Sequence, residues 1–108
     1  MFSFGLEKIN ELSKNICEEF SSTFPPEMQV EMKAKKDSRA NKRLISALDG
    51  IDRIIAGFLV TKPRIGVFRK AKCANDVKWG LKERGYEMEV VDAAVRKVVF
   101  GLAQKKPK

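Results

Sequence analysis

Histidine is absent from this sequence of 108 residues. It is the commonest general base near neutral pH and the usual partner of a serine or cysteine nucleophile, so no catalytic triad can be assembled. Asp49 and Asp52 form a close carboxylate pair on one predicted helix. Such a pair can bind a metal or share a proton, but beside Arg53 a solvated helix face is favoured. We therefore expect no catalytic residues and a protein that is not an enzyme.

Cysteine is scarce and glycine is scattered. Cys17 and Cys73 are the only cysteines and stand fifty-six residues apart, and without histidine they cannot complete a structural zinc site in a monomer. Neither Gly66 nor the pair Gly50 and Gly57 forms the clustered pattern that cradles a phosphate group. We expect no metal and no cofactor. Buried, reduced thiols are favoured over a disulfide, which indicates a reducing compartment.

Long hydrophobic runs are also lacking. The longest, Ile54 to Val60, has seven residues, far fewer than the roughly 20 that span a bilayer. The N-terminus has no basic residues ahead of an apolar run, so no signal peptide is predicted. The length fits one domain. We expect a soluble, cytoplasmic protein with a single helical domain over residues 1–104, a basic tail over residues 105–108 and no membrane partner.

The N-terminal third predicts one helix and one ambiguous segment. The helix extends from about Leu6 to Ser21 and is stopped by Pro25-Pro26, because proline lacks an amide donor and its ring clashes with the preceding turn. Its apolar stripe has helical spacing and consists of Leu6, Ile9, Leu12, Ile16, Cys17 and Phe20. Residues 28–36 alternate between apolar and polar side chains as a strand does, but a helical turn or an ordered loop fits equally well.

The segment from Leu44 to Val60 predicts a long helix that ends before Pro63, with Ser38 as a candidate N-cap. Its apolar stripe broadens after Arg53 until nearly all sides are apolar. We therefore expect it to be the central helix of the domain, surrounded by the others.

The C-terminal part predicts a helical hairpin. A helical turn is expected near Val67, and Asn75 is a candidate N-cap for a separate helix over residues 76–84. Gly85 fits the left-handed residue that follows a helix, and a last helix extends from about Met88 to Gln104. The expected fold is all-α, a small single-domain bundle of four or five helices with a C-terminal helical hairpin.

Positive charge is the most informative feature of the composition. The net charge is +8, and it is concentrated in two segments, with +4 over residues 29–43 and +4 over residues 63–73. The first cluster is Lys33, Lys35, Lys36, Arg39, Lys42 and Arg43, and the second is Arg64, Arg69, Lys70 and Lys72, with Lys78 and Lys82 just beyond. If both clusters lay on one side they would attract a polyanion, because cationic side chains release the counterions condensed on nucleic-acid phosphates.

Three aromatic residues bear on the choice of partner. Phe68 could stack on a base beside its basic neighbours, although packing in the core is favoured for it. Trp79 and Phe100 point away from the main apolar stripes of their helices. Packing of the N-terminal helix over them as a second layer is favoured; otherwise they contribute to an exposed patch for protein binding or self-association.

These observations predict a non-enzymatic accessory protein that binds nucleic acid or a nucleoprotein complex through its basic clusters, largely independently of sequence. The expected nucleic-acid-binding residues are Lys35, Lys36, Arg39, Lys42, Arg43, Arg64, Arg69, Lys70, Lys72, Lys78 and Lys82. The alternative is a protein-binding adapter or inhibitor, in which the basic surface recognises an acidic partner. In this alternative Trp79 and Phe100 would anchor the contact with the partner protein, and the protein itself could be a homodimer.

Overall fold

The computed structural model describes residues 2–34, 39–61 and 65–103, and the side chains of these residues except 2–6 and 32–34. The described residues form five helices, α1 (Phe2–Thr23), α2 (Met28–Ala34), α3 (Arg39–Thr61), α4 (Val67–Glu83) and α5 (Met88–Ala103). The predicted all-α bundle with a C-terminal hairpin is confirmed. The candidate cap Ser38 and the predicted basic tail lie outside the described residues.

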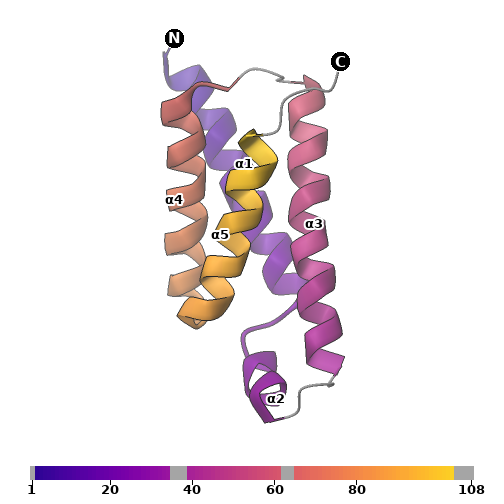
Figure 1. Ribbon diagram of the computed structural model, residues 1–108. Helices are drawn as coiled ribbons and strands as arrows, with labels where there is room; N and C mark the ends of the chain where they lie inside the picture. The colour runs from indigo at the N-terminus through magenta and orange to yellow at the C-terminus, as the bar shows by residue number, and fades with distance from the viewer. Residues whose placement is uncertain (1, 35–38, 62–64, 104–108) are drawn as a thin grey trace.

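Four long helices form a ring in which no helix is central (Figure 1). α1 packs against α3 and α4, and α5 packs against the same two helices from the other side. Among the described residues, α3 and α4 make no backbone contact with each other, so they occupy opposite corners of the ring. The prediction of a central α3 is therefore wrong. The broad apolar stripe of α3 faces α1 and α5. On the remaining side of the helix Ile45 and Val60 are exposed.

Of the segment left open between strand, helix and loop, residues 28–34 form the short helix α2, which packs beside the beginning of α3, and residues 35 and 36 lie outside the described residues. α1 ends just before Pro25-Pro26, as predicted. The carbonyl groups of these prolines accept hydrogen bonds from the amides of Met28 (2.9 Å) and Gln29 (3.1 Å). The proline pair therefore stops one helix and supplies the first acceptors of the next.

Gln29 joins α2 to the turn between α4 and α5. Its side chain is buried, and its amide group donates hydrogen bonds to the carbonyl oxygens of Pro26 and Gly85, both at 3.1 Å. Its Oε1 accepts a hydrogen bond from the backbone amide of Glu87 at 2.6 Å. All polar atoms of this buried amide side chain therefore have partners, which is what burial of a polar group requires.

The hairpin turn follows the predicted chemistry. Gly85 has a φ of +98°, the left-handed region that glycine enters without steric penalty. The amides of Gly85 and Tyr86 donate to the carbonyl oxygens of Lys82 (3.0 Å) and Leu81 (3.2 Å), which closes α4 with a Schellman motif. Tyr86 then turns into the core, where its hydroxyl donates to the carbonyl oxygen of Phe24.

The predicted helix start at Asn75 is wrong, because α4 is continuous through this residue. Cys73, Val77 and Leu81 recur at four-residue spacing and are fully buried, while Asn75 is exposed. The burial of this stripe outweighs the local preference of asparagine for a helix cap.

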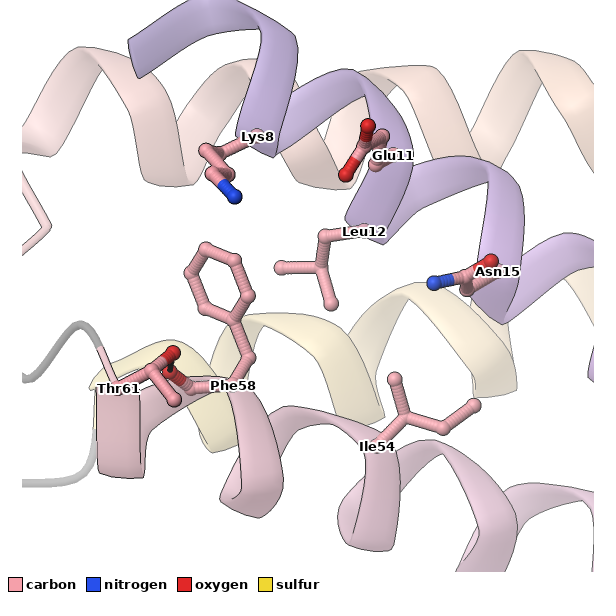
Figure 2. A pocket seen from close by; sticks show the side chains of 7 residues that line it. All are labelled: Lys8, Glu11, Leu12, Asn15, Ile54, Phe58 and Thr61. Atoms are coloured by element: carbon pink, nitrogen blue, oxygen red, sulfur yellow. Dashed lines mark hydrogen bonds between the residues drawn. The ribbon is translucent and has the colours of Figure 1, made fainter. Parts of the chain in front are cut away.

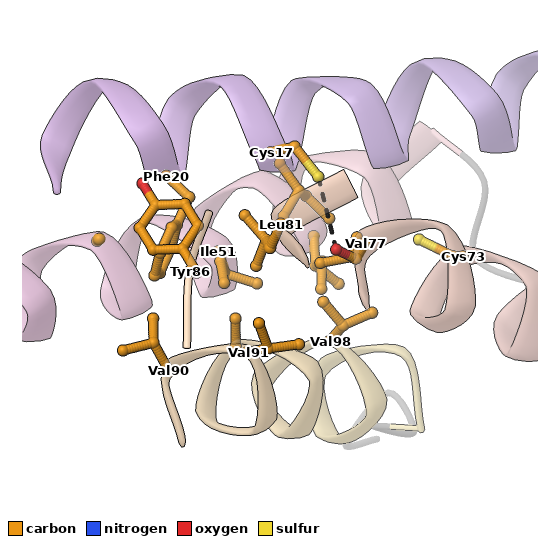
Figure 3. Packing of buried hydrophobic residues seen from close by; sticks show 14 of the residues in the cluster. Cys17, Phe20, Ile51, Cys73, Val77, Leu81, Tyr86, Val90, Val91 and Val98 are labelled. Carbon is orange, nitrogen blue, oxygen red and sulfur yellow. Dashed lines mark hydrogen bonds between the residues drawn. The ribbon is translucent and has the colours of Figure 1, made fainter. Parts of the chain in front are cut away.

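The core lies inside the ring and draws on all four long helices (Figure 3). The predicted apolar stripe of α1 is confirmed for Ile9, Leu12, Ile16, Cys17 and Phe20, which are all buried. Cys17 and Cys73 are buried free thiols, as predicted. Burial raises the pKa of Cys17 to about 11 and also raises the pKa of Cys73, since a thiolate loses its hydration there. Both side chains are therefore small apolar groups at neutral pH.

α1 and α4 approach closely at Gly80. A Cβ atom added to Gly80 would lie 2.7 Å from the Sγ of Cys17, and this Sγ is held 3.8 Å from the carbonyl oxygen of Val77 (Figure 3). α3 and α5 approach in the same way, because a Cβ atom on Gly101 would lie 3.0 Å from the Cδ1 of Ile55. Glycine at these two positions sets the spacing of the helices.

We predict that Gly80→Ala lowers the free energy of unfolding by about 1–3 kcal/mol, the usual cost of overpacking a closed core. In a Cys17→Ala background the same substitution should cost less, because the clashing Sγ is gone, and a double-mutant cycle in urea measures this difference. Gly57→Ala is the matched control. Nothing lies within 4 Å of its added Cβ, so it should stabilise α3 by about 0.5–1 kcal/mol. Equal effects at Gly80 and Gly57 would contradict the close approach.

We also predict that Gln29→Leu destabilises the protein by about 2–3 kcal/mol, because it removes every hydrogen bond that this side chain makes to the α4–α5 turn. Thermal and urea unfolding followed by circular dichroism measure the change. Val30→Ala, at the exposed neighbouring position, should change stability by less than about 0.5 kcal/mol. A Gln29→Leu variant as stable as Val30→Ala would show that the bridge contributes nothing.

Candidate nucleic-acid interface

The first basic cluster lies at the beginning of α3. Arg39, Lys42 and Arg43 are all exposed there, beside α2 at one end of the bundle (Figure 1). Lys35 and Lys36 lie outside the described residues. The part of this cluster that the structure describes is therefore a solvated surface of three cations.

The second basic cluster lies at the beginning of α4. Arg69, Lys70 and Lys72 are partly buried, and Arg64 lies outside the described residues. α4 starts at the end of the bundle where α3 finishes (Figure 1). Because the 23 residues of α3 extend for about 34 Å, the two clusters are about one helix length apart and on opposite corners of the ring. They do not converge on one face.

A different surface is formed by one face of α4. Phe68, Lys72, Asn75, Trp79 and Lys82 follow one another at steps of four and three residues. At about 100° per residue they lie within about 80° of each other, on the side opposite the buried stripe of Cys73, Val77 and Leu81. We call these five residues the α4 face.

Both aromatic residues of the α4 face are open to solvent. Phe68 is 89% exposed and Trp79 is 51% exposed. The favoured prediction that Phe68 packs in the core is wrong, and so is the prediction that the N-terminal helix covers Trp79. The orientation of α4 explains both results, because turning either ring inward would bring the buried stripe out. Asn75, interpreted from sequence as a helix cap, instead lies on the α4 face between the two rings.

Lysine side chains surround Trp79. The Nζ atom of Lys82 lies 4.8 Å from the centre of the indole ring and that of Lys78 lies 5.9 Å away, within the range of a cation–π interaction. Lys72 forms an ion pair with Asp76 at 2.9 Å one turn earlier, which offsets its charge. The positive charge of the α4 face is therefore concentrated next to Trp79.

A cavity of about 340 Å³ lies between α1 and α3 and is shown in Figure 2. Phe58 projects from α3 toward Leu12 of α1, while Lys8 and Glu11 stand at the rim (Figure 2). The hydroxyl of Thr61 donates to the carbonyl oxygen of Phe58 at 2.9 Å, so this polar group is already satisfied. The floor is apolar and the charged groups are solvated, so the cavity offers little to fix a polar ligand.

An apolar groove of about 780 Å³ runs between α3 and α5. Phe100 lies along it and is 66% exposed, so the prediction that the N-terminal helix covers this residue is also wrong. The groove is lined by Leu48, Asp52, Ile55, Ala56, Leu59, Ala93, Arg96, Lys97, Phe100 and Gly101. Sequence reasoning missed this surface because it treated α3 as enclosed. The signal available was Ala56, an apolar residue that lies about 120° from the centre of the main α3 stripe.

No family model, no curated protein and no solved structure matches this chain. Within the described residues, no three cysteine or acidic side chains gather closely enough to hold a metal ion. None of the five helices has the length and apolar character that crossing a bilayer requires, over the part of the chain that the structure describes.

Proposed function

We propose that this chain is a non-enzymatic nucleic-acid-binding protein, and that it holds single-stranded nucleic acid on the α4 face without strong sequence preference. The observation that carries this proposal is the exposure of two aromatic rings, Phe68 and Trp79, on one face of a helix that also presents lysines. Aromatic side chains interleaved with cations are the combination that single-stranded nucleic acid requires, because bases stack on the rings while cations neutralise phosphates.

The spacing of the two rings favours a single strand over a duplex. Phe68 and Trp79 are separated by eleven residues, or about 16 Å along the helix axis. Stacked nucleotides advance by about 3.4 Å per strand, so the two rings would take bases that are several nucleotides apart. Bases inside a duplex are already stacked on their neighbours and offer no free face to an exposed ring.

The lysines beside Trp79 fit this arrangement. Lys78 and Lys82 lie over the indole, so a base that replaced them on the ring would have both ammonium groups close to its phosphate. The first basic cluster, on the far corner of the ring, is too distant to act on the same few nucleotides. It would contribute through long-range attraction.

Duplex recognition by α5 is disfavoured. Glu87 and Glu89 stand at the start of this helix, where a recognition helix places the side chains that approach the phosphates and bases. Repulsion between these carboxylates and phosphates opposes such docking.

The second candidate function is a protein-binding adapter. The apolar α3–α5 groove with the exposed Phe100 supports it, because a large exposed aromatic beside a groove is typical of a protein-binding anchor.

We expect labelled single-stranded DNA and RNA to bind at low salt, and log affinity to fall linearly with log salt concentration. Fluorescence anisotropy measures both. Trp79 is the only tryptophan, so its emission should be quenched as a base stacks on it. Phe68→Ala and Trp79→Ala should each weaken binding about 5- to 160-fold, because stacking contributes about 1–3 kcal/mol per base. Val67→Ala, exposed beside Phe68 but off the α4 face, should leave binding unchanged.

Charge variants test whether the lysines beside Trp79 contact the phosphates. Lys78→Gln with Lys82→Gln should lower the salt slope by about 1.4, at about 0.7 per single-strand phosphate contact. Lys42→Gln with Arg43→Gln removes the same charge from the far corner and should leave the slope nearly unchanged. Absence of binding at low salt, or equal effects of the two pairs, would contradict the proposal.

A further inference from the structure

A cavity of about 380 Å³ lies between α1 and α4, directly beside the α4 face. Lys72 and Trp79 belong to both surfaces, because each is part of the α4 face and each also lines the cavity. The α4 face therefore continues around the helix, past Trp79, into a hollow that α1 closes on its far side.

Small residues form the floor of this cavity. Ser13 and Cys17 of α1 are buried there and meet Gly80 of α4. The two helices are already in close contact at this level, since a Cβ atom on Gly80 would lie 2.7 Å from the Sγ of Cys17. Larger side chains stand around the floor, among them the exposed Asn10 and Lys14 on α1. The cavity is thus a depression over small residues with a rim of long polar ones.

Trp79 has its lysines on one side and the cavity on the other. At about 100° per residue, Lys82 and Lys78 lie about 60° and 100° from Trp79 in one direction around α4. Glu83 and Asp76, which line the cavity, lie about 40° and 60° from Trp79 in the opposite direction. A strand whose phosphates contact the lysines would therefore present its bases across the indole, toward the cavity.

The charges that line the cavity are of both signs. Lys72 is paired with Asp76 at 2.9 Å, and the other charged groups are Lys14, Glu83 and Arg84. A phosphate group in the cavity would be repelled by two carboxylates. A nucleobase is neutral and carries hydrogen-bond donors and acceptors on its edges, so it can use groups of both kinds. The lining therefore favours a base over a phosphate.

The size of the cavity also fits a base. Small-molecule sites are about 300–1,000 Å³ in volume, and a cavity of about 380 Å³ is near the lower end of this range. It suits one planar ring system better than a longer piece of a polymer. The indole of Trp79 gives the cavity an aromatic wall, and the amide group of Asn10 at the rim has both a donor and an acceptor for the edge of a base.

We infer that this cavity receives one nucleobase of the bound single strand, the neighbour of the base that stacks on Trp79. The inference rests on the proposed function and deepens it, because it adds a pocket for one base to the rings and cations of the α4 face. A single strand permits this arrangement, since its bases can be splayed out of the stack and hydrogen-bonded on their edges. The cavity borders the indole, so the next nucleotide reaches it without a break in the strand.

Asn10→Leu tests the cavity, because leucine removes the amide group, occupies more of the space and is a better helix former than asparagine. Fluorescence anisotropy at low salt compares an intact single-stranded oligonucleotide with an abasic strand of the same length, which keeps the sugars and phosphates. Asn10→Leu should weaken binding of the intact strand about 2- to 10-fold, the size of one lost hydrogen bond. Its affinity for the abasic strand should equal that of wild type.

Asn15→Leu is the matched control, because it makes the same change at an exposed position of α1 that borders the α1–α3 cavity instead. It should alter neither affinity. Equal affinities of the two variants for the intact strand would overturn this inference and leave the proposed function in place. A loss for Asn10→Leu that is the same with intact and abasic strands would put a phosphate in the cavity and would also overturn it. A wild type that binds no strand would contradict both proposals.

Free adenosine distinguishes a base within a strand from a separate small ligand. It should displace the labelled strand from wild type only at about 1 mM or above, because a lone base lacks the contacts of the neighbouring phosphates and of the second ring. Displacement at about 1 μM would identify a site for free nucleosides and overturn the inference.

Discussion

The burial of one narrow stripe on α4 determines which side of this helix faces solvent. Cys73, Val77 and Leu81 give this helix one fully buried residue per turn, held between α1 on one side and α5 on the other. Rotating α4 about its axis would expose this stripe and break the close approach at Gly80. The opposite side of the helix is therefore fixed toward solvent, and Phe68 and Trp79 are on it.

Local features of the sequence predicted the elements well. The apolar stripe from Ile9 to Phe20 identified α1, the proline pair marked its end, and Gly85 located the hairpin turn. Each of these signals acts within a few residues, through periodicity, a missing amide or a permitted backbone angle. Two local signals were not decisive. Asn75 was wrongly predicted to be a helix cap, and the conformation of the segment from Met28 to Ala34 was left open. Tertiary packing decides the structure at both places.

The order of the helices around the ring could not be predicted, and the candidate site depends on it. The breadth of the α3 stripe suggested enclosure, whereas the helix packs against α1, α5 and, at its beginning, α2, and keeps an open side. Phe68 is apolar and looked like a core residue, but its position is set by the stripe one to three turns further along α4. Trp79 and Phe100 were placed correctly on the outer sides of their helices by angle alone. Whether another helix covered them depended on contacts between distant segments.

The surplus of positive charge is not gathered on one surface. The two basic clusters are separated by the length of α3, so the surplus of +8 is not one patch. Arg39, Lys42 and Arg43 make a solvated corner of the kind that aids solubility in many basic proteins. The α4 face holds fewer cations, but Lys82 lies beside the exposed indole ring of Trp79.

The two thiols have a consequence for the kinetics of the native state. Cys17 belongs to α1 and Cys73 to α4, and both side chains are sealed at the contact between these helices. A thiol reagent can attack them only after the helices separate, so the rate of labelling counts openings of this one interface. The two native thiols therefore report how often the contact between α1 and α4 opens, with no need for an engineered cysteine.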